Sequence, residues 1–421
     1  MKGSWNEMQA LIGICAFVGI AWILSEDRKK IKPRQIIAGL LLQAGLAFLL
    51  LKVPYFRGWV EVANAFVAIV ENATQNAASF MFGYLAGGDA PFDIVRPNAG
   101  FIVAFRVLPL VVVMSALSAL LFHWNILPLV VRSMAFVLSK TLKISGASGL
   151  AAAADVFLGI AEAPLFVRPY LGRMTRAELF MVMSCGMASV AGTVMVLYAS
   201  VLNPVIPDAI GHILVASVIS VPAALVLAQI LVPEKDETAL SGEAWRVEKT
   251  AESSLDAIVK GTSDGIQMLI NIVALIMVIF ALVHLTNGIF ALAGEVGGAP
   301  ITIQRLLSWP LYPFVWLMGV PSTEVSQGAN LMSTKILMNE FVAYLDMAKL
   351  DSQALSSNAR LIMTYGMCGF ANLASLGILI GTLTAIIPER RKEVIGLGFK
   401  SLVVGNLATM MTGALAGLLL N

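Results

Sequence analysis

The stretch Met181-Val-Met-Ser-Cys-Gly-Met-Ala-Ser-Val-Ala191 recurs without gaps as Leu361-Ile-Met-Thr-Tyr-Gly-Met-Cys-Gly-Phe-Ala371. The two stretches share a Met, a Gly-Met pair and a final Ala at matching positions. Each follows a short apolar segment that holds one glutamate, Gly159-Ile-Ala-Glu162-Ala-Pro164 before the first and Leu337-Met-Asn339-Glu340 before the second. The chain therefore contains one unit twice, an acidic apolar segment followed by a Gly-interrupted helix.

The two glutamates lie in segments that are otherwise apolar enough for a membrane interior. An ionised side chain in the middle of a bilayer costs several kcal/mol, so acidic residues at this depth usually face a cavity and bind something. A single glutamate in such a place could also be paired structurally. Because Glu162 and Glu340 occupy corresponding positions of the two units, we interpret both as binding-site residues.

Composition assigns the chain to the membrane proteins. Of its 421 residues, 58% are hydrophobic and only 13% are charged, whereas soluble domains carry roughly 25% charged residues. Many stretches reach the ~18 uncharged residues that a helix needs to cross a bilayer. The net charge of +2 gives no support for nucleic-acid binding, and the scattered His and Cys residues lack metal-ligand spacing.

The sequence predicts an all-α polytopic membrane protein with about eight spans, and the N-terminal segment does not look like a cleavable signal peptide. The spans are expected near 8–25, 35–53, 101–121, 178–202, 209–232, 266–290, 357–382 and 395–420. Residues 55–90 suit an interfacial amphipathic helix, and 123–143 suit another surface helix. The corresponding division is 1–125 (N-terminal helices), 126–232 (interfacial helix and first repeat), 233–264 (cytoplasmic linker) and 265–421 (second repeat and last helix).

Loop charges predict the topology. Basic clusters at 28–34 and 390–392 are expected on the cytoplasmic side, with the N-terminus outside. Both clusters share one side only if 144–177 and 321–350 enter and leave the membrane on the same side. We therefore predict re-entrant hairpins near 145–170 and 321–345, followed by broken helices near 178–202 and 357–382. Interrupted segments in corresponding halves indicate a transporter binding site, an inverted repeat and alternating access.

Four segments, taken in order, carry a family resemblance: Gly159-x-x-Glu162-Ala-Pro164-Leu165, Gly192-Thr193-Val194, Asn339-Glu340-Phe341-Val342-Ala343-Tyr344 and Phe370-Ala371-Asn372-x-x-Ser375. They resemble the signature segments of the concentrative nucleoside transporters, and the resemblance covers nearly the whole chain. It implies a homotrimer in the bacterial inner membrane that imports nucleosides down a cation gradient. No enzymatic activity and no organic cofactor are implied, and the partners are the nucleoside and membrane lipid.

The resemblance also implies roles for individual residues. The first hairpin tip and Val194 would face the nucleobase, and Glu340 would accept hydrogen bonds from ribose hydroxyls. Phe370, Asn372 and Ser375 would complete the pocket. The implied substrate-binding set is Gly159, Ile160, Ala161, Glu162, Val194, Glu340, Phe370, Asn372 and Ser375. We expect no Arg or Lys cluster in these segments, which disfavours a charged nucleotide.

Two departures from the family pattern leave questions open. Ile160 and Ala161 stand where the family usually has two polar residues, so base selectivity cannot be carried over. The implied sodium site comprises Asp155, Leu158, Ser189 and Val190, with Asp155 where the family usually has Asn. An aspartate can bind sodium or carry a proton. We expect sodium coupling, with proton coupling as the alternative.

Other readings of these residues remain open. Asp155 could cap a half-helix or pair with Arg168, and Asn372 with Ser375 could simply join two helices by hydrogen bonds. A secondary transporter of another small solute is the second class of function. An acidic solute would be repelled by the two glutamates. An intramembrane enzyme is a third class, but Ser189 has no Lys or His at helical spacing.

Overall fold

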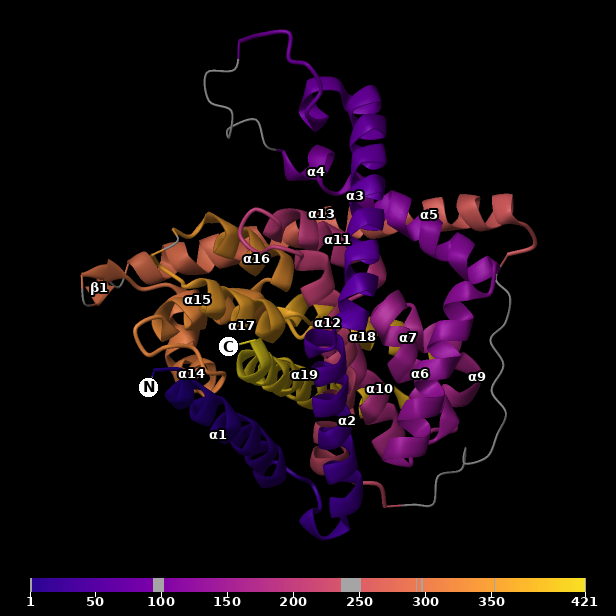
Figure 1. Ribbon diagram of the computed structural model, residues 1–421, viewed down its shortest axis with the longest axis vertical. Helices are drawn as coiled ribbons and strands as arrows, with labels where there is room; N and C mark the ends of the chain where they lie inside the picture. The colour runs from indigo at the N-terminus through magenta and orange to yellow at the C-terminus, as the bar shows by residue number, and fades with distance from the viewer. Residues whose placement is uncertain are drawn as a thin grey trace.

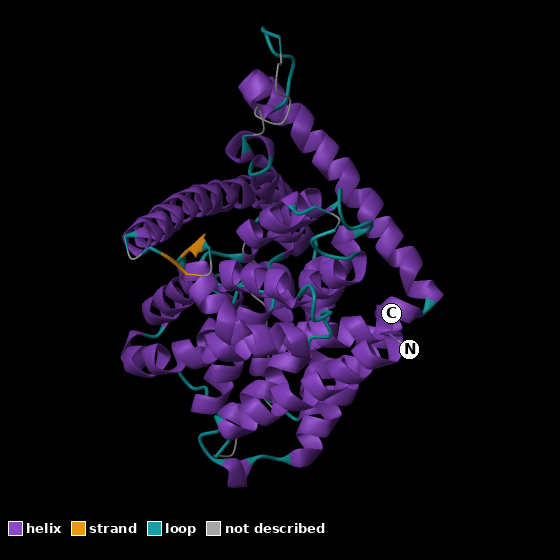
Figure 2. Ribbon diagram, turned by 90° about the vertical axis from the view of Figure 1, so that its left-hand side faces the viewer, coloured by secondary structure: helices purple, strands orange, loops and turns teal. Residues whose placement is uncertain are grey.

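The computed structural model describes residues 2–93, 102–235, 251–292, 294–296, 298–351 and 353–420. Nearly all of these residues are helical, as the sequence predicts (Figure 1). The two strands, β1 (Glu295–Val296) and β2 (Ala299–Pro300), form a small antiparallel ladder just after a long helix (Figure 2). Six helices in the described part are long and apolar enough to cross a membrane.

The N-terminal part contains α1 (Lys2–Ile23), α2 (Pro33–Lys52) and α3 (Pro54–Phe82), with a 3-10 turn, η1 (Arg28–Lys30), between the first two. A second 3-10 turn, η2 (Gly83–Ala86), follows α3. Then come α4 (Val103–Arg106), α5 (Pro109–His123) and α6 (Ile126–Leu142). The segment predicted as an interfacial helix is thus helical over most of its length, and its placement at the membrane surface stays a prediction.

The two repeats follow the same order of elements. The first has α7 (Gly146–Leu158), α8 (Ala163–Phe166), α9 (Arg168–Leu171), α10 (Arg176–Ala188), α11 (Gly192–Leu202) and α12 (Ala209–Leu231). The second has α15 (Val325–Leu337), α16 (Glu340–Lys349), α17 (Ser357–Met367), α18 (Leu373–Ile386), a 3-10 turn η4 (Pro388–Arg390) and α19 (Arg391–Leu420). In each, a helix–turn–helix hairpin precedes a helix broken in the middle and then a long helix.

Between the repeats lie α13 (Ser254–Ala291) and α14 (Ile303–Leu317). The predicted linker, 233–264, overlaps the first residues of α13, which begins at Ser254, where Ser253 caps it. Residues 236–250 of that linker lie outside the described residues. Only 6% of the most apolar window of α13 is buried within this chain, whereas α12 and α19 are each 83% buried. The core is therefore built around α12 and α19 together with α10 and α11, which are 94% buried, and α13 lies at its edge.

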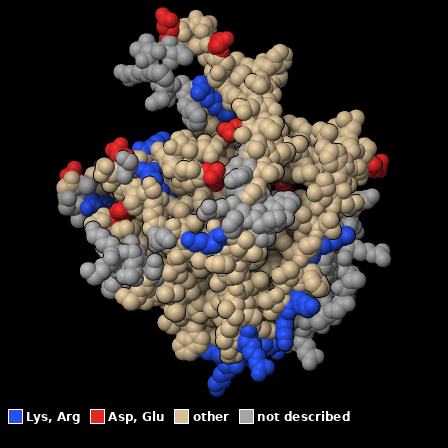
Figure 3. Space-filling view, in the orientation of Figure 1, with Lys and Arg blue, Asp and Glu red and all other residues tan. Residues whose placement is uncertain are grey.

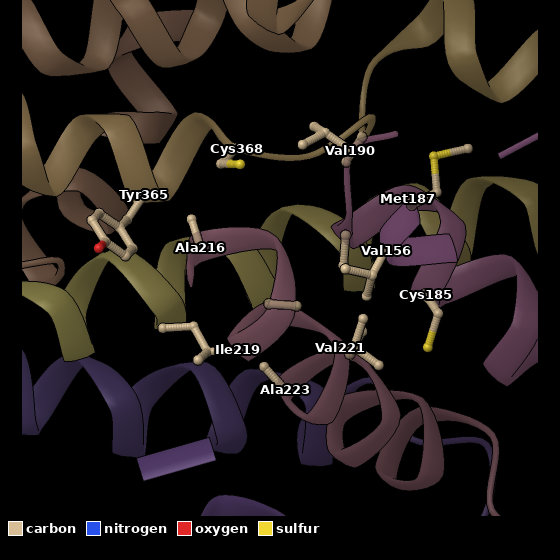
Figure 4. Close-up of a cluster of buried hydrophobic side chains, with 14 of the residues drawn as sticks. Val156, Cys185, Met187, Val190, Ala216, Ile219, Val221, Ala223, Tyr365 and Cys368 are labelled. Carbon is tan, nitrogen blue, oxygen red and sulfur yellow. The ribbon is translucent and has the colours of Figure 1, made fainter. Parts of the chain in front are cut away.

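The breaks of the two repeats pack on this core. Figure 4 shows Val190 and Cys368, one from each break, above side chains of α12. The labelled α12 residues are Ala216, Ile219, Val221 and Ala223. Such close packing holds irregular backbone inside protein, which is the condition for tolerating it at membrane depth.

Lys and Arg side chains gather at the end of the molecule where α1 meets α2, at the bottom of Figure 3. There Glu26 accepts hydrogen bonds from Arg176 at 2.9 Å and from Lys400 at 2.5 Å, which ties the α1–α2 loop to α10 and α19. The hydrogen bond from Arg176, assisted by Lys400, lowers the pKa of Glu26 from 4.5 to about 2. This network joins elements of both repeats at one surface.

Candidate functional site

The first hairpin turns at Gly159, which ends α7 with φ +88°. A Cβ at this position would lie 2.6 Å from the Cβ of Ala191, in the break between α10 and α11. Both the backbone conformation and the close approach therefore require glycine. Glu162 follows in the turn, its amide donating to the Gly159 carbonyl at 3.2 Å, and the next helix begins at Ala163 with Pro164 in its first turn. The turn thus presents residues 159–162 to the centre of the molecule.

The second hairpin turns at Met338 and Asn339. The Asn339 side chain caps α16 by accepting a hydrogen bond from the Val342 amide at 2.9 Å. Glu340 is therefore the first residue of α16, where the helix dipole favours a negative charge. The local sequence Asn-Glu accordingly both turns the chain and places a carboxylate at the hairpin tip.

The two broken helices meet at their breaks. The first break spans 189–191 and the second spans 368–372. The Phe370 amide donates to the Ser189 carbonyl at 3.1 Å, so the two breaks share a backbone hydrogen bond. Asn372 caps α18 by accepting from the Ser375 amide at 2.8 Å. The two tips and the two breaks lie around one centre.

A cavity of about 430 Å³ lies at this centre. Its size falls in the range of small-molecule sites, about 300–1,000 Å³. All nine residues predicted to bind substrate line it: Gly159, Ile160, Ala161, Glu162, Val194, Glu340, Phe370, Asn372 and Ser375. The structure therefore brings together residues that are more than two hundred positions apart, although their contacts with a substrate remain a prediction.

Glu340 is held by two donors in this cavity. Tyr198 donates its hydroxyl to Oε1 at 2.5 Å, and Asn372 donates its side-chain amide to Oε2 at 2.9 Å. Only 2% of Glu340 is exposed. A carboxylate can accept about four hydrogen bonds, so two acceptor positions remain for a ligand. The two donors fix the orientation of the Glu340 carboxylate, and with it the directions from which a ligand can donate to the carboxylate.

The residues predicted to bind sodium also cluster. Ser189 Oγ lies 3.3 Å from the Asp155 carbonyl and donates to the Cys185 carbonyl at 2.9 Å. Asp155, Leu158, Ser189 and Val190 are all buried. Among the described residues, none donates a hydrogen bond to Asp155 Oδ2, and the pairing with Arg168 considered from the sequence is not formed. Buried oxygens with an unfilled acceptor are suitable ligands for a hard cation, and a carboxyl can equally hold a proton.

Comparison with known proteins identifies the family. The family model described as Na+ dependent nucleoside transporter C-terminus matches residues 212–417, and its N-terminal counterpart matches 12–85. A third model, described as Nucleoside recognition, matches 104–205. The nucleoside permease NupC of Helicobacter pylori is 30% identical, over 98% of this chain and 98% of NupC. The chain belongs to the sodium-dependent nucleoside transporter family. It is the family that the sequence motifs resemble.

Further relatives agree with this assignment. The putative nucleoside permease NupX of Escherichia coli is 31% identical, over 98% of both chains. The solved structure of CNTnw in an inward-facing substrate-bound state is 36% identical, with a TM-score of 0.89 over 98% of this chain and 99% of CNTnw. This member of the nucleoside transporter family is thus an integral, multi-pass membrane protein and a transporter, with no enzymatic role in the family.

One cation near the cavity was missed by the sequence analysis. Lys335, in α15 of the second hairpin, is fully buried and donates to the Ala371 carbonyl at 3.1 Å and to Asn406 Oδ1 at 2.8 Å. The sequence analysis expects no cluster of Arg or Lys in the binding segments, and it does not single out Lys335. The Lys335 ammonium donates to a backbone carbonyl of the second break. It does so from outside the cavity, because Lys335 is not among the residues that line the cavity.

Lys335 and Asp155 occupy comparable places in the two repeats of this transporter. The helices α7 and α15 are both 13 residues long, and each of the two residues lies within the last four positions of its helix. Asp155 approaches the break at Ser189, and Lys335 approaches the break at Ala371. The first break therefore has a buried carboxyl beside it, and the second has a tethered cation.

The sequence analysis also missed Tyr198 and one wall of the cavity. Tyr198 lies four residues after Val194 in α11, so both share one helix face, and this spacing could have identified it. The missed wall belongs to α13 and includes Asp264, Gln267 and Asn271. These three polar residues recur at helical spacing within an apolar segment, a pattern that indicates a polar face on a membrane helix. Asp264 had been assigned to the linker instead.

Proposed function

We propose that this protein is a secondary active symporter that imports nucleosides, driven by a sodium gradient, by alternating access. The observation that carries the proposal is the carboxylate of Glu340, held between Tyr198 and Asn372 at the wall of the cavity. A ribose diol donates well to such a carboxylate, and hydrogen bonds to a charged acceptor are the stronger kind. The names and solved structures of the relatives support the same substrate class.

The rest of the cavity suits a neutral nucleobase. Val194 and Phe370 offer apolar surface, and Glu162 offers a polar group at the first hairpin tip. Lys335 is bonded away from the cavity, and Arg168 lines a separate, neighbouring cavity. A phosphate would therefore meet three carboxylates, those of Glu162, Asp264 and Glu340, which disfavours a nucleotide and supports the nucleoside.

For the coupling ion we propose sodium at Asp155, Ser189, Leu158 and Val190. The support is the name of the family model and the buried oxygens of Asp155 and Ser189, close to the first hairpin tip. An ion there would join α7 to the break at Ser189 and thus stabilise the tip that faces the base. The specific observation that favours a proton is the unbonded oxygen of the Asp155 carboxyl.

Alternating access is supported by the matched hairpins and broken helices of the two repeats, since such repeats can exchange roles by moving as bodies. We further propose a homotrimer in the bacterial inner membrane. Its support is the family resemblance, together with the long and little-buried α13, which leaves a broad apolar surface for lipid or neighbouring subunits. Native mass spectrometry in detergent should show a trimer, and a monomer under all mild conditions would contradict that part.

Competition of labelled uridine uptake tests the substrate. In a host deficient in nucleoside uptake, unlabelled nucleosides should compete, whereas free bases and ribose should not. Competition by an unrelated small neutral solute, with none by nucleosides, would support the alternative of a different solute. Measuring the same panel with and without sodium, at fixed pH, separates sodium from proton coupling.

A further inference from the structure

The first hairpin tip of this protein offers little to recognise a base. Ile160 and Ala161 cannot donate or accept hydrogen bonds through their side chains, which leaves Glu162 as the polar side chain of the tip. An ionised carboxylate can only accept, yet the Watson–Crick edge of every nucleobase carries both donors and acceptors. A site that binds several nucleosides tightly needs acceptors and donors side by side. Other residues of the cavity must supply them.

The opposite wall of the cavity has such groups. Asp264, Gln267 and Asn271 line the cavity from α13, and all three are exposed within this chain. Their spacing of three and four residues places them on one face of the helix. The surrounding helix is strongly apolar, with a mean hydropathy of 2.8 in its best window. Polar residues in such a helix face a cavity and are functional by default.

Gln267 and Asn271 form a pair. The Gln267 side-chain amide donates to Asn271 Oδ1 at 3.0 Å. This bond leaves the Gln267 oxygen as an acceptor and the Asn271 nitrogen as a donor for a further partner. If both amides rotate, the bond persists in the opposite direction and the two outward groups exchange roles. The pair therefore always presents one donor beside one acceptor.

We propose that Gln267 and Asn271 read the Watson–Crick edge of the nucleobase, which rests on the proposed nucleoside transport. Uracil presents N3–H beside O4, and adenine presents its exocyclic amine beside N1, so each offers a donor next to an acceptor. The rotatable amide pair matches both patterns. Recognition of the base edge thus lies on α13 rather than on the hairpin tip, and the pocket accepts more than one base.

Asp264 extends this wall toward a second cavity. It lines both the central cavity and a neighbouring one of about 580 Å³, together with Glu162 and Leu158. Lys260 of α13 lines only the second cavity. The polar face of α13 is thus continuous from the amide pair to this neighbouring space.

The test compares uridine with 3-methyluridine, whose N3 is blocked, in competition for labelled uridine uptake. The wild-type protein should bind 3-methyluridine about tenfold or more weakly, because the methyl group removes the N3–H donor and blocks the base edge from the amide pair. In the double variant Gln267→Ala/Asn271→Ala this ratio should fall toward one. The ratio of uridine to 2′-deoxyuridine, which reports on the ribose, should stay as in the wild type.

Asn287→Ala is the matched control. Asn287 lies on the same helix and bonds to Gln304 and the Ile303 amide, outside the cavity. It should keep the wild-type ratio for 3-methyluridine even if expression falls. An unchanged ratio in the double variant, or a wild type that does not discriminate, would overturn the assignment. Failure of wild-type protein to take up uridine at all would instead refute the proposed function.

Discussion

Glu340→Gln is the substitution that addresses the ribose site most directly. The variant keeps the shape of the side chain but removes its charge. Hydrogen bonds to a charged group contribute about 1.5–3 kcal/mol, against about 0.5–1.5 for neutral ones, so each ribose bond should lose about 1 kcal/mol. Two such bonds correspond to about 2 kcal/mol, or roughly a 30-fold weaker apparent affinity for uridine.

The contacts of Glu340 make this roughly 30-fold loss of apparent affinity a lower limit. Glu340 accepts from both Tyr198 and Asn372, whereas a glutamine keeps only one acceptor oxygen. If its amide nitrogen faces Asn372, two donors oppose each other. If it faces Tyr198, that hydroxyl must turn to accept. Either arrangement also replaces one acceptor for ribose with a donor, which costs more than the loss of charge alone.

Uptake competition by uridine and by 2′,3′-dideoxyuridine measures the effect. The wild type should prefer uridine strongly, and Glu340→Gln should lose most of that preference. Glu324→Gln is the matched control on the same hairpin, because Glu324 accepts from Ser356 at 2.9 Å outside the cavity. If Glu340→Gln is well folded and still prefers uridine as strongly as the wild type, the ribose assignment is wrong.

Two further predictions concern residues around the site, and a third concerns the surface network at Glu26. Asp155→Asn should shift the sodium concentration for half-maximal uptake and abolish any acid stimulation, and unchanged sodium and pH profiles would exclude Asp155 from coupling. Lys335→Met should reduce the amount of folded protein, because Asn406 Oδ1 loses its donor, at a cost of about 1–3 kcal/mol; normal thermal stability would contradict this. Glu26→Gln should lower stability at neutral pH by about 1 kcal/mol. Because the folded pKa of Glu26 is depressed to about 2, wild-type stability should fall as the pH drops from about 4.5 to about 2, and the difference from the variant should vanish there in thermal unfolding of detergent-solubilised protein.

The repeat could be read from the sequence because its chemistry is local. Gly159 and Asn339 are turn residues, and the two matched stretches end where the helices break. Two acids at corresponding positions then indicated a shared cavity. For these elements the local sequence and the fold agree, so pattern and turn chemistry were sufficient.

The missed features depend on contacts between distant segments. Lys335 meets Asn406, 71 positions away, and a single lysine in a helix gives no hint of that partner. The start of α13 was placed too late because Asp256, Lys260 and Asp264 made the segment resemble a solvated linker. In the structure, Lys260 and Asp264 instead line cavities. Polar residues that line a cavity therefore look like linker residues when composition alone is considered.

The most direct test of the account is uridine accumulation in proteoliposomes that contain the purified protein. An inward sodium gradient, imposed at equal pH on both sides, should drive internal uridine above its external concentration, and collapsing the gradient should release it. Accumulation driven by a proton gradient alone would overturn sodium coupling and leave nucleoside symport in place. Absence of accumulation under either gradient, with correctly folded protein, would contradict the central claim.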